Sequence, residues 1–215
     1  MDNKTDQAYE GIKRKIIFGD ISNNTPISAN GLSKALNMSK TPVRDALNKL
    51  QTEGFIRIIP NQGIIVQELT VAEVTQMYEL RVAIEEYLAK KAVTLLTDEH
   101  IEHFKEIIER QRDAMVKNDP FEFMKYDNQQ HLFLHKVYYN PIIFDVVNRM
   151  TDRIFYGGVQ ALRNPGRMAQ VLDEHIRLVC ALEARSVEKF NQALEVHFSQ
   201  GLSSTTISVE RNWAD

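Results

Sequence analysis

The chain contains 215 residues, of which 43% are hydrophobic and 26% are charged, so it has enough apolar residues for a packed core. Its net charge of −3 excludes a protein that is strongly basic throughout. The charge is unevenly distributed: residues 1–70 hold nine Lys/Arg against seven Asp/Glu, a net charge of +2, and the remainder holds 17 against 22, a net charge of −5. This distribution fits a mildly basic DNA-binding module joined to an acidic domain.

The sequence also bears on compartment. The first residues are polar and no apolar run approaches the ~18 residues that span a bilayer, so we expect a cytoplasmic protein without a membrane partner. The single cysteine, Cys180, excludes an intrachain disulfide, and the apolar helical run around it predicts a buried side chain.

Residues 1–69 are predicted to form three helices and a hairpin. Residues 7–18 form the first helix, a turn-rich connector covers residues 19–28, and residues 30–36 form a short second helix joined by a tight turn to the third. The third helix contains Pro42 in its first turn, is capped by Ser39 or Thr41, and ends at Gly54. Two β-rich runs, residues 55–59 and 64–66, then flank a glycine-containing turn. This order predicts a winged helix.

The third helix has two different faces. Val43, Ala46, Leu47 and Leu50 recur at helical spacing and predict a buried stripe. The opposite face carries cations and hydrogen-bonding groups: Lys40, Thr41, Arg44, Asn48 and Lys49. They lie near a helix N-terminus, where the backbone itself favours the binding of phosphate. The same pattern also occurs in ordinary surface helices. DNA binding is favoured here because the helix belongs to a predicted winged helix.

The motif Ser39-Lys-Thr-Pro-Val-Arg-Asp-Ala-Leu47, followed by Glu53-Gly54 and Asn61-Gln-Gly63, resembles the DNA-binding domain of the GntR family of bacterial transcription regulators. The resemblance covers about the first seventy residues. Lys40 stands where an arginine is usual, and Ala29 and Gln62 also depart from the family pattern. The resemblance implies binding to double-stranded DNA through Lys40, Thr41, Arg44, Gln62 and Gly63.

The remainder of the chain, residues 70–215, has a wholly helical pattern. Thr70 and Glu73 predict a capping box at the boundary. Short breaks then separate predicted helices at residues 71–96, 98–117, 121–139, 142–162, 167–184 and 187–209. We therefore expect a mainly α protein: a winged helix-turn-helix domain over residues 1–69 and an antiparallel all-helical bundle of six (or seven) helices over residues 70–215.

Four residues of this bundle form a candidate metal site. Asp127 and His131 are spaced i, i+4 and share one helix face, and His175 and His197 lie on two later helices. If these helices face one centre, one carboxylate and three imidazoles can bind a divalent zinc, nickel, manganese or iron ion. The alternative is four unrelated polar residues that are hydrogen-bonded in or near the core.

Residues 71–205 resemble the ligand-binding domain of the FadR subfamily, called FCD. The resemblance lies in Tyr78-Glu-Leu-Arg81, in Asp127-x-x-x-His131 followed by Asn140-Pro141, in Glu174-His175, and in His197. It implies a divalent metal on Asp127, His131, His175 and His197. Gln130 departs from a usual phenylalanine, and six helices rather than seven suggest the VanR-like branch.

Arg81 has two interpretations. It can pair with Glu85 one turn later, or, as the family resemblance implies, point into a cavity above the metal and hold a carboxylate effector through paired hydrogen bonds. Tyr126, Arg149 and Arg153 are weaker candidates for the cavity wall.

These features predict a homodimeric, DNA-binding transcription regulator that meets a palindromic operator and responds to a small organic acid at a metal site. Three alternatives remain: the metal is structural or absent, the metal is itself the signal, or the histidines serve a metal-dependent hydrolase or lyase. The last would need a positioned general base and a substrate cleft, which the sequence does not indicate, and we expect no enzyme.

Overall fold

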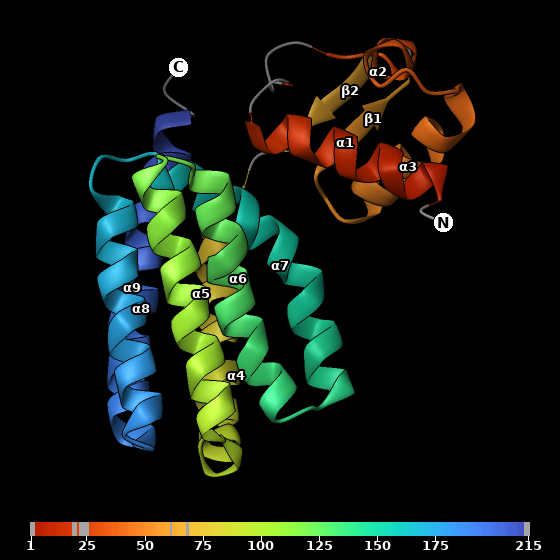
Figure 1. The fold of residues 1–215 in the computed structure, drawn as a ribbon. Coiled ribbons are helices and arrows are strands. Elements are labelled where there is room, and N and C mark those ends of the chain that lie inside the picture. Colours follow the sequence, from red (N-terminus) through yellow and green to blue (C-terminus); the bar gives the residue numbers. More distant parts are fainter. Residues whose placement is uncertain (1–2, 19–20, 22–25, 61, 68, 213–215) are drawn as a thin grey trace. The chain divides into compact units, whose positions relative to one another are not determined.

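The computed structural model describes residues 3–18, 21, 26–60, 62–67 and 69–212. The chain divides into two compact units, residues 1–68 and residues 69–215, called here the N-terminal domain and the helical domain. The two units are described separately (Figure 1). Part of the predicted connector, and Asn61 of the wing motif, lie outside the described residues.

The N-terminal domain contains three helices and one hairpin. In chain order these are α1 (Lys4–Phe18), α2 (Ala29–Ala35), α3 (Lys40–Thr52), β1 (Ile56–Ile59) and β2 (Gly63–Val66). Helix α3 packs against α1, α2 and β1. It buries Val43, Ala46, Leu47 and Leu50, so its apolar stripe forms the centre of this core and its polar face remains outside.

Two glycines fix the local geometry of this domain. Gly54 follows the last turn of α3 with a φ of 78°, the left-handed conformation that ends many helices. Gly63 has a φ of +115°, and a Cβ atom there would lie 3.0 Å from the carbonyl oxygen of Ile27. This close approach lets Ile27 form an antiparallel bridge with Ile64 beside the hairpin, whose register pairs Ile56 with Val66.

The helical domain contains six α-helices among the described residues, which confirms the mainly α prediction. They are α4 (Val71–Ala92, followed by a 3-10 turn at Val93–Leu95), α5 (Asp98–Val116), α6 (Pro120–Val137), α7 (Pro141–Leu162), α8 (Arg167–Glu183) and α9 (Val187–Asn212). No helix in the described part of the chain is long and apolar enough to cross a membrane.

Polar caps define where these helices begin. Thr70 and Glu73 form a capping box at α4, and Thr97 forms another at α5 with His100 in the third position. Helices α6 and α7 each begin with a proline at the first helical position, preceded by a capping side chain, Asp119 and Asn140 respectively. The starts of four of the six helices, α4 to α7, are therefore set by local sequence.

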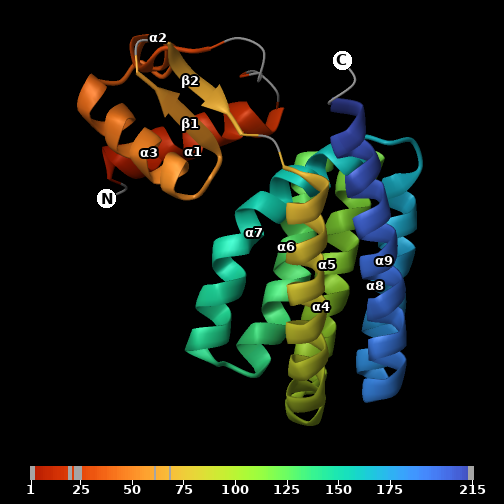
Figure 2. The same ribbon diagram turned by 180° about the vertical axis from the view of Figure 1, so that it is seen from behind.

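Side-chain packing joins helices that are distant in sequence. Helix α9 packs against α4, α7 and α8, and α5 packs against α6 and α8. The six helices run side by side in both views of the bundle (Figures 1 and 2). Side chains from α6, α8 and α9 can therefore meet at one depth of the bundle.

Two details of this packing matter later. A Cβ atom on Gly157 of α7 would lie 2.9 Å from the methyl group of Thr205 and 3.1 Å from Leu69, so three segments meet at this point. Cys180, by contrast, is exposed, so its predicted burial is wrong. It belongs to an exposed stripe of α8 with Asp173 and Arg177, at helical spacing, and the apolar run includes this outer side of the helix.

Candidate metal centre and DNA-binding surface

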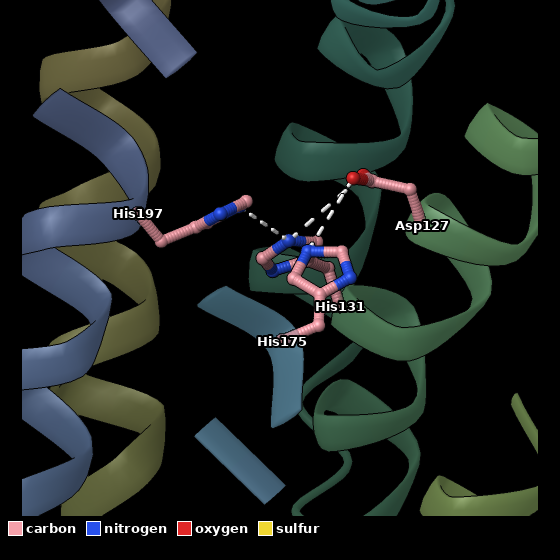
Figure 3. A group of neighbouring side chains, drawn as sticks. All are labelled: Asp127, His131, His175 and His197. Carbon is pink, nitrogen blue, oxygen red and sulfur yellow. Dashed lines mark hydrogen bonds and ion pairs between the residues drawn. The ribbon is translucent and has the colours of Figure 1, made fainter. Parts of the chain in front are cut away.

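The four predicted metal ligands come together inside the helical domain. Asp127 and His131 project from α6, His175 from α8 and His197 from α9 (Figure 3). All four side chains are buried, and one potential ligand atom from each lies within 4.8 Å of the others. The i, i+4 spacing on α6 places two of them on one face, and the packing of α8 and α9 brings the other two. These residues could hold a metal ion.

Each imidazole ring is oriented by an oxygen behind it. The outer nitrogen atoms lie at hydrogen-bond distance from three acceptors: His131 Nδ1 is 2.7 Å from Glu85 Oε2, His175 Nδ1 is 2.9 Å from Gln111 Oε1, and His197 Nδ1 is 2.8 Å from Glu174 Oε2. Because an ionised carboxylate or an amide oxygen only accepts, each Nδ1 carries the proton and donates it. The Nε2 lone pairs are therefore left free to bind a metal, as in carboxylate–histidine metal sites.

The Nε2 atoms of the three rings lie close together and lack hydrogen-bond donors. His131 Nε2 lies 3.2 Å from His197 Nε2, and His175 Nε2 lies 3.4 Å from Asp127 Oδ2. If Nδ1 holds the proton in each ring, the first contact joins two lone pairs and the second joins a lone pair to a carboxylate, so both are repulsive. His175 Nε2 is also buried without a hydrogen-bond partner. A cation among these atoms would relieve each defect, so the residues present fit a divalent metal.

Buried charges keep the surrounding groups in the required protonation states. Burial alone would raise the pKa of Glu85, but His131 and Arg81 beside it lower the pKa to about 2, so the carboxylate is ionised. Burial and the charge of Arg81 lower the pKa of His131, and burial together with His197 lowers the pKa of His175 well below 6.5. Both rings are therefore neutral near pH 7, as metal binding requires.

A small cavity opens beside the candidate ligands. Its wall includes Asp127 and His197, together with Arg81, Tyr78 and Thr205. The space that the centre of a water-sized sphere can occupy is about 30 Å³, compared with the ~10–15 Å³ that one water needs. The cavity therefore has room for about two to three water-sized groups.

Arg81 satisfies both of its predicted interpretations in part. Its Nε donates to Glu85 Oε1 at 2.9 Å, and its guanidinium lies 5.1 Å from the ring centroid of Phe198. Within the described residues, its two Nη groups make no hydrogen bond, and they belong to a side chain that lines the cavity. Arg81 can thus keep its ion pair and still donate to a ligand.

A second arginine was not identified from the sequence. Arg167 donates from Nη1 and Nη2 to the two oxygens of Glu174 at 2.6 and 3.2 Å, and Glu174 in turn holds His197. Two arginine–glutamate–histidine chains therefore support the centre, one through Glu85 and one through Glu174. The available signal was the seven-residue spacing of Arg167 and Glu174, which places both on one face of α8 two turns apart.

The weaker candidates lie elsewhere. Neither Tyr126 nor Arg149 is among the described residues that line the cavity, and Arg153 pairs with Glu73 at 3.2 Å. Gln111, which orients His175, was also not identified from the sequence. It lies on α5, 64 residues away from its partner, so no local spacing relates the two.

The N-terminal domain carries a separate polar surface. Lys40 and Arg44 of α3 and Gln62 and Gly63 of the wing line one surface groove, which we call the α3–wing groove. Thr41 lies outside the groove wall, but it is exposed in the first turn of α3. Asn48 and the start of α2 also line the groove. The five residues implicated in DNA binding thus lie on one side of this domain or in the adjoining turn.

Comparison with known proteins agrees with both parts of the chain. Residues 4–66 match the bacterial regulatory proteins of the gntR family, and residues 76–200 match the FCD domain. The HTH-type transcriptional repressor RspR of Escherichia coli K12 is 26% identical over 197 residues, which cover 90% of this chain and 85% of that protein. The HTH-type transcriptional regulator McbR of the same organism is 23% identical over 202 residues, covering 92% and 90% of the two chains.

Solved structures share the fold. The E. coli McbR/YncC structure has a TM-score of 0.80 at 22% identity, covering 95% of this chain and 98% of that one. A putative GntR regulator from Rhodococcus sp. RHA1 has a TM-score of 0.77 at 17% identity, covering 94% and 96%. These relatives are transcription regulators and not enzymes. The chain is therefore a member of the GntR family of the FadR type, with a GntR helix-turn-helix domain followed by an FCD domain.

Proposed function

We propose that this protein is a cytoplasmic, homodimeric transcription regulator whose affinity for a palindromic operator is controlled by a small organic acid bound beside a divalent metal ion. The observation that carries the proposal is the convergence of the Nε2 atoms of His131, His175 and His197 and the carboxylate of Asp127 in one buried place, next to the cavity that Arg81 lines. The family of the chain and the exposed cations of the N-terminal domain support the DNA-binding part.

The metal would be held by Asp127, His131, His175 and His197, and when bound it would offer open coordination positions to a carboxylate oxygen. The residues of the chain perform the remaining tasks. Glu85, Gln111 and Glu174 hold the ring orientations. Arg81 has donors that can bind the other carboxylate oxygen, and the buried surroundings strengthen this bond by excluding water.

At the DNA, α3 would enter the major groove with Lys40, Thr41 and Arg44, and the wing would approach the minor groove or backbone with Gln62 and Gly63. A ligand in the helical domain controls operator affinity only if it binds two arrangements of the dimer with different affinity. The close approach of both Thr205 and Leu69 to Gly157 supports a route, because Thr205 also lines the cavity and Leu69 directly precedes the cap of α4 at Thr70.

A gel-shift titration of metal-loaded protein with short carboxylates tests the proposal. We expect at least one acid to change operator affinity, and we expect no change with metal-stripped protein. If every acid leaves operator affinity unchanged although metal is bound in stoichiometric amount, the metal is structural and the regulatory part of the proposal is wrong.

A further inference from the structure

The charged side chains buried in the helical domain allow a charge balance. Among the described residues, five Asp, Glu, Arg or Lys side chains are buried, and all surround the candidate metal centre: Arg81, Arg167, Glu85, Glu174 and Asp127. Their relative exposure ranges from 1% to 7%, so solvent does not compensate them. Two positive and three negative groups give this centre a net charge of −1.

The imbalance has one source. Arg81 is paired with Glu85 at 2.9 Å, and Arg167 is paired with Glu174 at 2.6 Å, so these four charges cancel within two ion pairs. Asp127 alone has no cationic side chain opposite it other than histidines that are neutral as metal ligands. A divalent ion held by Asp127 and three neutral imidazoles therefore changes the net charge of the centre from −1 to +1.

An uncompensated charge in a buried site is costly, and a ligand that neutralises it gains the corresponding attraction. One negative charge brings the metal-loaded centre to zero. A dianion would overshoot to −1 beside Asp127 and the two glutamates. Without metal, even a monoanion would raise the negative charge of the centre to −2.

The rest of the cavity wall supplies hydrogen bonds and no further cation beyond Arg81 and Arg167. Tyr78 and Thr205 lie with their hydroxyl oxygens 3.2 Å apart, and Ser204 also lines the cavity. Arg167 donates both terminal nitrogens to Glu174 and so is already neutralised. A second carboxylate on the ligand would face hydroxyl groups only, whereas an alcohol group could exchange hydrogen bonds with them.

We propose that the cavity selects a short monocarboxylate that carries a hydroxyl group, excludes dicarboxylates of the same skeleton, and admits its ligand only after the metal. This inference deepens the proposed function and depends on its metal site. The carboxylate would bind beside Asp127 and His197 and to the Nη groups of Arg81, with the hydroxyl group towards Tyr78 and Thr205.

Calorimetric titration of the full-length, metal-loaded protein tests the charge rule. Lactate and malate are suitable probes, because malate is a 2-hydroxy acid like lactate with one additional carboxylate, and propionate lacks the hydroxyl group of lactate. We expect lactate to bind more tightly than propionate and malate to bind least. Tighter binding of malate than lactate, lactate binding to metal-stripped protein, or failure of every short monocarboxylate to bind would overturn the inference.

Two substitutions of Arg81 separate charge from shape. Arg81→Gln removes the compensating cation and should lower lactate affinity about tenfold to hundredfold while metal content is retained. Arg81→Lys keeps the charge but loses the fork of donors, so it should bind lactate more weakly than the unchanged protein and still prefer lactate to malate. Loss of the preference in Arg81→Lys with unchanged affinity in Arg81→Gln would contradict the charge balance.

The hydroxyl contact has its own variant. Thr205→Val keeps the branched shape and removes the hydroxyl group, so it should lower the affinity for lactate and leave the affinity for propionate unchanged. Gel shifts with the same acids separate this inference from the proposed function. If malate binds and alters operator affinity, the charge rule fails and the regulatory function stands; if lactate binds without altering operator affinity, the charge rule stands and the regulatory function fails.

Discussion

The Nε2 atoms of His131 and His197 lie 3.2 Å apart, and the Nδ1 atom of each ring is held from behind by a glutamate. Each glutamate is in turn held by an arginine, Arg81 or Arg167. Two rings on different helices are thus pressed together with their basic nitrogen atoms facing. This arrangement is unfavourable by itself and favourable around a cation, so it links metal binding to the stability of the helical domain.

Removal of the metal should therefore lower the melting temperature. A ligand that binds only the folded state at a thousandfold excess over its Kd stabilises by about 4 kcal/mol, and in a chain of this size each kcal/mol shifts the melting temperature by about 2–4 °C. Differential scanning calorimetry with and without chelator measures the shift. Asp127→Asn is the matched control, because it keeps the shape and removes the charged ligand; an equal response to chelator in this variant would mean that the metal binds elsewhere.

The orientation of His175 should tune metal affinity. Gln111→Leu keeps most of the side-chain volume but removes the acceptor of His175 Nδ1, so we expect metal affinity to fall roughly tenfold to hundredfold, as for other outer hydrogen-bond partners. Competition with a chelating dye measures the affinity. Gln130→Leu is the control, because Gln130 is also buried but its Oε1 has no hydrogen-bond partner in the described structure. Equal losses in both variants would point to a packing effect.

The metal-stripped protein should become less stable in mild acid. His131 and His175 have lowered pKa values in the folded state, so below about pH 6.5 the unfolded chain takes up protons that the folded chain does not. Stability from these groups is fully present above that pH and falls by up to about 1.4 kcal/mol per pH unit for each ring as pH decreases. Thermal melts between about pH 7.5 and about pH 5.5 measure the slope. The exposed His103→Gln variant should leave it unchanged, and a flat profile would contradict the buried, neutral state of the two rings.

Arg44→Ala should weaken operator binding strongly. If Arg44 contacts only phosphate, the slope of log affinity against log salt should fall by roughly one, and the affinity for all DNA sequences should fall by the same factor. If it contacts a guanine, discrimination at that base pair should fall by ~1–3 kcal/mol. Fluorescence anisotropy with operator and scrambled DNA distinguishes the two cases. Lys117→Ala removes one exposed cation from the helical domain as a control; unchanged operator affinity in Arg44→Ala would exclude α3 from the recognition role.

Much of the architecture was predictable because it depends on local chemistry. The capping boxes at Thr70 and Thr97, and the breaks at Pro120 and Pro141, set the helix boundaries from a few adjacent residues. The winged helix followed from the motif around Pro42 and from Gly54. These features need no knowledge of tertiary packing.

The surroundings of the candidate metal centre were less accessible. Only the i, i+4 relation of Asp127 and His131 is local, and the positions of His175 and His197 depend on how α8 and α9 pack. The sequence suggested Glu85 as a partner of Arg81 but gave no sign that its second oxygen holds His131 from a different helix. The prediction that Cys180 is buried was wrong for a related reason: an apolar run indicates a helix, but not which of its residues faces outward.

The absence of a side chain at Gly157 allows two other segments of the helical domain to pack close to the backbone of α7. Thr205, from the cavity wall, and Leu69, from the start of the helical domain, both lie close to the backbone of Gly157. A displacement of either side chain towards α7 is therefore limited by the backbone of Gly157, where even a methyl group would find no room. If the proposed route runs through this point, a chimaera in which an unrelated DNA-binding domain is fused immediately before Leu69 should respond to the same ligand.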